Sequence, residues 1–145
     1  MNQVQIKRIR KNAILPSYAS PEAAGADLYA CLGDEVVIAP HSTAMIPLGF
    51  STAIPTGWVG LIFARSGLAS KRDLAPANKV GVIDADYRGE WFVPLHNHGE
   101  QSRLVEPGDR IAQLIIVPCM TASFCEVEEL SETVRGAGGF GSTGT

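Results

Sequence analysis

Residues 81–90 read GVIDADYRGE: an apolar pair, two aspartates, a tyrosine and an Arg-Gly turn. A second apolar run follows at 91–95. Two short β-prone runs separated by a polar segment that contains glycine predict a β-hairpin. Residues two apart in an extended chain share a face, so Asp84 and Asp86 can point into one cleft. Because aspartate is depleted in strands, this pair indicates either tight-turn chemistry or a functional cleft.

The composition and the spacing of apolar runs predict a single all-β domain. The chain has 145 residues, of which 46% are hydrophobic and 19% charged, as in globular domains that bury a substantial core. Its 15 glycines and 9 prolines separate short runs rich in Val, Ile and Leu. We expect an edge strand near residues 4–9, strands at 35–38, 42–47, 50–54, 57–64, 101–105 and 110–118, and a short helix at 66–72. Such regular short strands are typical of a sandwich or a jelly roll.

Charge and hydropathy exclude several classes of partner. A net charge of −3, without an extended basic block, argues against binding to nucleic acid. No apolar run approaches the roughly 20 residues of a membrane span, and the first residues lack the apolar core of a signal peptide. Cys31, Cys119 and Cys125 are odd in number and widely spaced, which predicts buried thiols in a reducing compartment. We therefore expect a cytoplasmic protein.

Four polar positions next to apolar runs are candidates for binding. Asp27 opens an expected strand after a turn of small residues, where capping the turn is the simpler explanation. Ser66 would be the N-cap of the predicted helix, so that free N–H groups of the first turn face an anion. Arg65 adds a fork of donors suited to phosphate. Gln113 interrupts an apolar run and must be hydrogen-bonded, either to a neighbouring loop or to a ligand.

The C-terminal residues 135–145 read RGAGGFGSTGT. A Gly-rich terminus is by default a flexible tail, because glycine has the most conformational entropy to lose. One arginine and one aromatic residue among the glycines indicate a second possibility. Phe140 can cover a base ring, while successive glycine N–H groups form a nest for phosphate. We interpret the segment as a tail that becomes ordered on a triphosphate.

Five segments together resemble the trimeric deoxyuridine triphosphatase (dUTPase) family. The family's ordered motifs match residues 24–28 (AGADL), 65–69 (RSGLA), 81–90, 108–114 (GDRIAQL) and 135–144 (RGAGGFGSTG). Each motif alone is a weak signal, but the five span almost the whole chain in the family's order. One departure is Ala64, where the family commonly has proline, and we expect a slightly looser turn there.

The resemblance implies a distorted β jelly roll in one domain, residues 1–134, followed by a flexible Gly-rich tail, residues 135–145, that closes over an active site. It also implies a homotrimer with sites at subunit interfaces, and hydrolysis of dUTP to dUMP and pyrophosphate with Mg²⁺. This reaction would limit uracil in DNA and supply dUMP for thymidylate synthesis. A triphosphate can supply most of the oxygen ligands of Mg²⁺, so no cluster of carboxylates is needed.

The resemblance assigns individual residues as well. Asp84 would be the general base that activates the water attacking the α-phosphorus, and Tyr87 would lie against the deoxyribose and exclude a 2′-hydroxyl. The uracil edge would be bound by Asn78 and by the backbone that includes Gly81, Val82 and Ile83. Phosphate contacts would come from Arg65, Ser66, Gly67 and Gln113, and lid contacts from Arg135, Phe140, Gly141, Ser142 and Thr143. Asp27 would act on the metal indirectly, through the Mg-triphosphate and its waters.

Three alternatives are open on the sequence alone. A dCTP deaminase, with or without triphosphatase activity, would share the trimeric jelly-roll plan, although the context of Tyr87 and the Gly-Phe-Gly tail fit the triphosphatase better. A regulatory protein that binds dUTP without turnover would keep the pocket but need not retain Asp84 and Arg135. A capsid-like jelly-roll module would have no reason for a Gly-rich tail.

Overall fold

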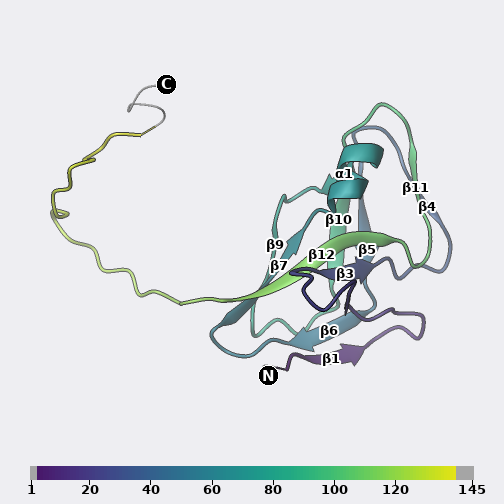
Figure 1. Cartoon of the computed structure of the whole chain (residues 1–145), viewed down its shortest axis with the longest axis horizontal. Helices are drawn as coiled ribbons and strands as arrows, with labels where there is room; N and C mark the ends of the chain where they lie inside the picture. Colours follow the sequence, from purple (N-terminus) through teal and green to yellow (C-terminus); the bar gives the residue numbers. More distant parts are fainter. Residues whose placement is uncertain (1–2, 140–145) are drawn as a thin grey trace.

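The structure is a computed structural model that describes residues 3–139 (Figure 1). Within this range the chain forms twelve strands and one helix. The strands are β1 (Gln5–Arg8), β2 (Ser17–Tyr18), β3 (Ala26–Tyr29), β4 (Val36–Ile38), β5 (Thr43–Pro47), β6 (Phe50–Ala53), β7 (Trp58–Phe63), β8 (Leu74–Pro76), β9 (Gly81–Ile83), β10 (Phe92–Asn97), β11 (Arg103–Val105) and β12 (Arg110–Pro118). The helix α1 spans Ser66–Arg72 and lies against β8.

The strand β12 is the centre of the largest sheet, which has the order β2-β3-β12-β7-β9. It pairs with β3 through residues 110–114 and with β7 through residues 113–118. A three-stranded sheet, β5-β10-β8, and two two-stranded sheets, β1-β6 and β11-β4, complete the domain (Figure 1). Strand pairing is antiparallel throughout the described residues. The prediction of an all-β distorted jelly roll in a single domain is confirmed.

The hydrophobic core joins the two larger sheets. Trp91 and Phe50 are completely buried, and their ring centroids lie 5.3 Å apart. Leu28 of β3 and Val93 of β10 are equally buried in the same cluster. Burying one such side chain stabilises the fold by about 1.5–3 kcal/mol relative to leaving it exposed. The β3 strand that carries Asp27 is therefore held rigidly by its apolar neighbours.

The predicted hairpin across residues 81–90 is wrong. β9 pairs with β7 in the five-stranded sheet, whereas β10 pairs with β5 and β8. Trp91 provides the physical reason, because its buried ring draws the chain across to the other sheet. The backbone N–H of Trp91 donates to the Phe50 carbonyl at 3.0 Å, and the backbone carbonyl of Trp91 accepts from the Leu48 N–H at 2.9 Å. Residues 84–91 consequently form a loop between the two sheets.

The other predicted elements are observed, with bounds shifted by at most two residues. The helix α1 occupies the predicted residues and ends at Asp73, which has a left-handed φ of 54° and donates its N–H to the Leu68 carbonyl. The predicted edge strand is β1, which pairs with β6. The apolar run at 110–118 forms β12, which is mostly buried in its N-terminal half and only partly covered in its C-terminal half.

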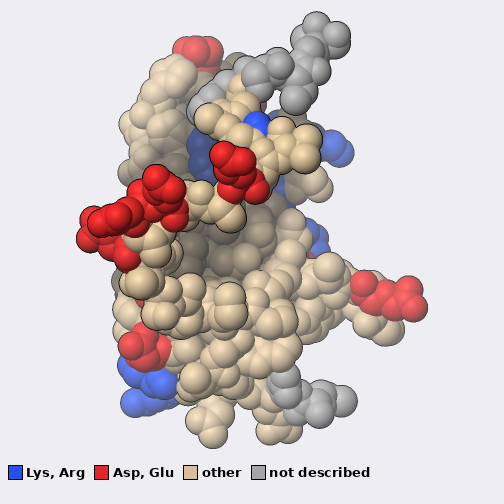
Figure 2. Space-filling view, turned by 90° about the vertical axis from the view of Figure 1, so that its left-hand side faces the viewer, with Lys and Arg blue, Asp and Glu red and all other residues tan. Residues whose placement is uncertain are grey.

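Beyond β12 the chain leaves the domain as an extended arm, residues 119–139 (Figure 1). Large apolar side chains of this arm are exposed, among them Met120, Phe124, Leu130 and Val134. On the face from which the arm leaves, acidic side chains gather in several places, with Lys and Arg mainly at the edges (Figure 2). Among the described residues, no helix is both long and apolar enough to cross a membrane.

The expectation of buried thiols holds for one cysteine and is wrong for the other two. Cys31 is buried and its thiol donates to Asn12 Oδ1 at 3.2 Å. Cys119 and Cys125 are exposed, because both belong to the arm and not to the domain. All three are free thiols.

We predict that iodoacetamide at about pH 8 modifies Cys31 in the native protein at least roughly tenfold more slowly than in the urea-unfolded chain. Burial raises the pKa of the Cys31 thiol, so that less of the reactive thiolate is present there. Peptide mass spectrometry measures the rates, and the urea-unfolded chain serves as the control in which all three thiols react alike. Equal rates for Cys31 in the native and the unfolded chain would contradict the burial of Cys31.

Candidate active site

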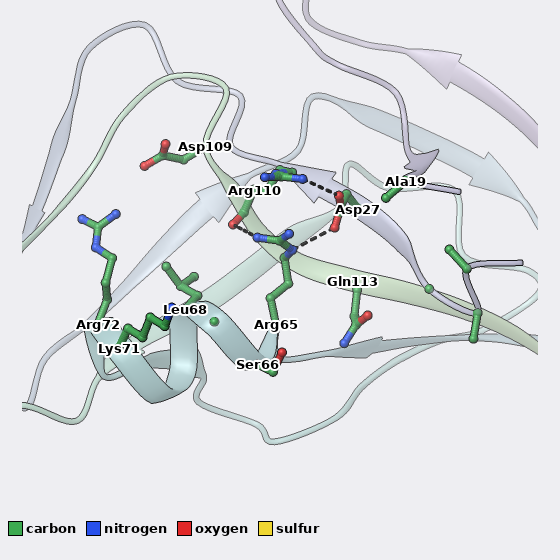
Figure 3. Close-up of a pocket in the computed structure, with 14 residues that line it drawn as sticks. Ala19, Asp27, Arg65, Ser66, Leu68, Lys71, Arg72, Asp109, Arg110 and Gln113 are labelled. Atoms are coloured by element: carbon green, nitrogen blue, oxygen red, sulfur yellow. Dashed lines mark hydrogen bonds and ion pairs between the residues drawn. The ribbon is translucent and has the colours of Figure 1, made fainter. Parts of the chain in front are cut away.

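A pocket of about 680 Å³ opens between β3, α1 and the start of β12 (Figure 3). Its lining comes from three stretches that are distant in sequence, residues 19–27, 65–72 and 109–113. Antiparallel pairing of β3 with β12 brings the first stretch beside the third, and β7 delivers the second. Three of the five motif segments therefore meet in one place. The polar residues of the lining are Asp27, Arg65, Ser66, Lys71, Arg72, Asp109, Arg110 and Gln113.

Asp27 is the centre of the pocket's charge network. It lies within β3 and is only 8% exposed, so it does not cap a turn. Arg65 Nε donates to Asp27 Oδ1 at 2.8 Å, and Arg110 Nη1 donates to Asp27 Oδ2 at 3.2 Å (Figure 3). A buried carboxylate is tolerated when it is paired and hydrogen-bonded, and both oxygens of Asp27 meet that condition. The carboxylate fixes two guanidinium groups at the pocket wall.

Arg110 was missed by the sequence interpretation, although it belongs to the matched segment 108–114. The available signal was its position, a cation at the start of an otherwise apolar strand. The register of β12 against β3 shifts between Arg110 and Ala112. Such a bulge re-aims the neighbouring side chain, and here Arg110 points to Asp27. A bulge depends on the strand partner, so the sequence alone does not reveal it.

Ser66 is not the N-cap of α1, contrary to the prediction. The N-cap is Arg65, whose backbone is extended at φ −89° and ψ 127°, and no side chain caps the helix. The Arg65 carbonyl instead accepts from the N–H groups of Leu68 and Ala69 at 3.1 and 2.9 Å. Ser66 and Gly67 form the first turn and line the pocket beside Arg65. Ser66 therefore lies in the pocket wall next to Arg65, but its predicted role as the N-cap is wrong.

Gln113 is hydrogen-bonded, as a glutamine in an apolar strand must be. Its Nε2 donates to the Ala64 carbonyl at 2.8 Å, which ties β12 to the residue before Arg65. A Cβ atom added at Gly25 would clash with the Gln113 amide oxygen, so glycine is required at that position for close approach. The Gln113 side chain also lines the pocket. Both alternatives that the sequence left open, a loop contact and a ligand contact, are compatible with this placement.

Further cations make the pocket suitable for a polyanion. Lys71 and Arg72, from the last turn of α1, line it together with Arg65 and Arg110. Four basic side chains thus face two acidic ones in the lining, Asp27 and Asp109. Arg72 donates to the Leu104 carbonyl and is thereby fixed against β11. An excess of fixed donors and positive charge is the environment that binds phosphate groups.

The loop 84–91 contributes to a different pocket, of about 490 Å³. Asp84 and Asp86 both line it, which confirms that the two carboxylates share one cleft. Trp58 of β7 and Cys119 of the arm form other parts of its wall. No residue of this loop lines the pocket around Asp27. Within one described chain, the predicted base and the predicted phosphate ligands therefore belong to separate cavities.

The remaining predicted residues that the structure describes do not line the Asp27 pocket. Asn78 is exposed in the turn between β8 and β9, with its amide nitrogen near the Gly81 backbone. Val82 and Tyr87 are exposed, at 62% and 43%. Arg135 is exposed on the arm, where its Nε donates to the Gly138 carbonyl at 2.9 Å. The predicted residues Phe140, Gly141, Ser142 and Thr143 lie outside the described residues.

The donor set does not form a resident metal centre. Residues 3–139 contain no cluster of three or more His, Cys, Asp or Glu side chains arranged to hold a metal ion. Both oxygens of Asp27 already accept hydrogen bonds from arginines. The four basic side chains of the lining instead suit the oxygens of a phosphate chain. These residues therefore fit a metal ion that is bound to phosphates and not one held by the protein alone.

We predict that Asp27→Asn lowers the free energy of unfolding by about 1–3 kcal/mol, because two guanidinium groups lose a charged acceptor. Urea denaturation measures the change. Asp34→Asn is the matched control, since Asp34 is exposed and its replacement should change stability by less than about 0.5 kcal/mol. Equal stability of the Asp27 variant and the wild type would show that the network does not hold the strands together.

Comparison with known proteins agrees with the geometry. The family model described as dUTPase matches residues 11–144. The deoxyuridine 5'-triphosphate nucleotidohydrolase of Syntrophotalea carbinolica is 50% identical over 141 residues, covering 97% of this chain and 96% of that protein. The one of Acinetobacter baumannii is 45% identical over 147 residues, covering 98% of each. A solved structure of a Staphylococcus bacteriophage 80alpha dUTPase mutant with dUpNHpp has a TM-score of 0.92 at 33% identity, with both chains covered completely. The chain belongs to the dUTPase family.

Proposed function

We propose that the protein hydrolyses dUTP to dUMP and pyrophosphate, by attack on the α-phosphorus of a water molecule that Asp84 activates. The observation that carries this proposal is the cationic pocket built by three family motifs around Asp27, in a chain of the dUTPase family. The substrate is supported by relatives that are named deoxyuridine 5'-triphosphate nucleotidohydrolases and match this chain over nearly its full length.

The pocket around Asp27 holds the triphosphate. Arg65, Ser66, Gly67 and Gln113 contact phosphate oxygens, and the cations of Lys71 and Arg110 add to the positive potential. Phosphoryl transfer requires of the protein chiefly positioning and stabilisation of the charge that develops on the phosphate oxygens. Guanidinium groups fixed by Asp27 and by backbone carbonyls supply this without reorganisation.

Mg²⁺ would be bound to the triphosphate, as part of the substrate complex, and not to a carboxylate cluster of the protein. It prefers octahedral oxygen ligands and retains water, so the triphosphate fills much of its coordination sphere. The bound ion would neutralise phosphate charge in the transition state. Asp27 would act on it indirectly, through the Mg-triphosphate and its waters, while it also holds Arg65 and Arg110 in the pocket wall.

Asp84 is suited to be the general base. It follows β9 directly, and the pairing of Ile83 with Gly60 fixes the end of that strand. Among the described residues its carboxylate forms no ion pair, so it is free to accept a proton from water. A positioned base of this kind typically contributes about 10²–10⁴-fold to a rate.

The loop and turn around Asp84 bind the nucleoside. Asn78 and the backbone of Gly81, Val82 and Ile83 bind the uracil edge, and Tyr87 lies against the deoxyribose. Cytosine would present an amino group where uracil has a carbonyl, leaving a donor unpaired at a cost of about 1–3 kcal/mol. Hydrogen bonding to the base edge thus discriminates against the wrong base.

The complete site forms between subunits of a homotrimer. The separation of the Asp84 pocket from the Asp27 pocket supports this, because one chain alone does not unite the base with the phosphate ligands. The exposed apolar side chains of the arm also favour contact with another subunit. Arg135, Phe140, Gly141, Ser142 and Thr143 would then close the Gly-rich tail over a neighbouring subunit's site.

Pyrophosphate release from dUTP, dCTP, UTP and dTTP with Mg²⁺ tests the reaction. We expect turnover of dUTP alone, reduced about 10²–10⁴-fold by Asp84→Asn. Asp86→Asn is the matched comparison, since it removes a charge from the same pocket and should reduce turnover by less than about tenfold.

Two outcomes would replace the proposal. Ammonia release from dCTP would identify a deaminase of the same fold. Tight binding of dUTP without turnover by the wild type would identify a regulatory protein that retained the pocket. An Asp84→Asn variant as active as the wild type would leave hydrolysis intact but remove Asp84 as its base.

A further inference from the structure

The motif residues Arg88, Gly89 and Glu90 have no role in the function described so far. They close the loop that carries Asp84 and Tyr87. The loop begins with a turn in which the Tyr87 N–H donates to the Asp84 carbonyl at 3.2 Å. Arg88 Nη1 donates to the Ala85 carbonyl at 2.7 Å and to the Tyr87 carbonyl at 3.1 Å. The guanidinium of Arg88 therefore holds the backbone on both sides of Asp86.

The ring of Tyr87 lies folded back over Gly89. Its hydroxyl donates to the Glu90 carbonyl at 3.0 Å. A Cβ atom added at Gly89 would overlap the hydroxyl and two ring carbons of Tyr87. Gly89 has no left-handed φ, so glycine is needed here for the space it leaves and not for its backbone conformation. The ring thus packs directly on the backbone of residues 89–90.

Glu90 is anchored in turn by a distant part of the chain. Arg10 Nε donates to Glu90 Oε1 at 2.6 Å, and Arg10 Nη2 donates to Glu90 Oε2 at 3.1 Å. The Glu90 side chain is only 17% exposed. The Arg10 backbone is fixed as well, because its N–H donates to the Gly49 carbonyl at 3.0 Å. A bidentate pair of this kind is among the more rigid ion pairs in proteins. Arg10 and Glu90 are 80 residues apart in the sequence.

We propose that the bidentate pair Arg10–Glu90, together with Gly89, positions the Tyr87 ring and thereby sets the preference for deoxyribose over ribose nucleotides. The proposal rests on the role of Tyr87 at the sugar given above. The chain of contacts runs from Gly49 through Arg10 and Glu90 to the Tyr87 hydroxyl. Arg10 and Glu90 are positioning residues, since they act on the nucleotide through Tyr87.

A ring that excludes a 2′-hydroxyl must resist displacement by roughly the width of one oxygen atom. One hydrogen bond to the Glu90 carbonyl and one close contact with Gly89 supply that resistance. A single neutral hydrogen bond contributes about 0.5–1.5 kcal/mol, which corresponds to a factor of about 2–10 in discrimination. Loss of the Arg10–Glu90 pair should therefore raise turnover of UTP relative to dUTP by a factor of about 2–10.

The ratio of kcat/KM for dUTP to that for UTP is the quantity to measure. Tyr87→Ala first establishes whether the ring discriminates at all. Arg10→Met removes the ion pair, and Gly89→Ala displaces the ring by a steric route that leaves every charge in place. We expect Arg10→Met and Gly89→Ala each to lower the ratio about 2–10-fold. Arg10→Lys, which retains charge without the bidentate geometry, should lower it less than Arg10→Met.

A double-mutant cycle separates positioning from general destabilisation. Tyr87→Phe removes the hydroxyl that contacts the Glu90 carbonyl. In that background Arg10→Met should change the ratio by less than about twofold, because the connection is already broken. Arg103→Met is the matched control: it deletes another ion pair, with Asp73, that does not contact the loop, and should leave the ratio unchanged.

The outcomes distinguish the two levels of the proposal. If Tyr87→Ala leaves the ratio unchanged, the sugar role of Tyr87 fails. If Tyr87→Ala lowers the ratio but Arg10→Met and Gly89→Ala do not, the sugar role stands and the positioning by Arg10, Glu90 and Gly89 is overturned. Equal losses for dUTP and UTP in Arg10→Met, or full additivity with Tyr87→Phe, would also overturn it.

Discussion

The carboxylate of Asp27, held between two guanidinium groups, is the interaction on which the site depends. Its partners lie 38 and 83 residues further along the chain. One is the last residue before α1, and the other is the first residue of β12. An unpaired carboxylate at 8% exposure would cost several kcal/mol, so the fold is stable only when these three segments meet. The pairing of β3 with β12 therefore also places Arg65 and Arg110 at the wall of the pocket.

This arrangement also determines what the pocket can bind. Asp27 neutralises part of the charge of Arg65 and Arg110 but leaves donors on both that face the cavity. Lys71 and Arg72 then bring the lining to an excess of positive charge. The arginines are positioned before any ligand arrives, and a preorganised set of donors binds a charged phosphate chain without the entropy cost of ordering them. The loop with Asp84 is organised separately, by Arg88 and by the Arg10–Glu90 pair.

The sequence was sufficient for features that depend on local pattern. Short β-prone runs between Gly and Pro turns located most of the strands, although not β2 and β8, and α1 has the bounds that were predicted for residues 66–72. The five motif segments also selected most of the residues that meet in the pocket, including Asp27 and Gln113. These signals are local, and neighbouring side chains did not override them.

The failures each involve a partner far away in the chain. The hairpin after Ile83 was wrong because Trp91 is drawn to Phe50, which no local pattern reveals. Ser66 was expected to cap α1, but it is the first residue of the helix, and the N-cap is Arg65, whose side chain is held by Asp27. Arg110 was overlooked because its direction depends on a bulge against β3. Long-range pairing therefore decides how the motif residues are oriented, whereas the sequence indicates which residues they are.

In the proposed trimer, the general base Asp84 and the phosphate ligands, which line separate pockets in one chain, come together across subunits. Asp84→Asn and Arg65→Gln, each expected to be nearly inactive, can be unfolded, mixed in equal amounts and refolded together. If each site takes Asp84 from one subunit and Arg65 from another, random assembly restores about one quarter of wild-type dUTP turnover. A mixture no more active than the separate variants would contradict the shared site and place both residues in the same subunit's chemistry.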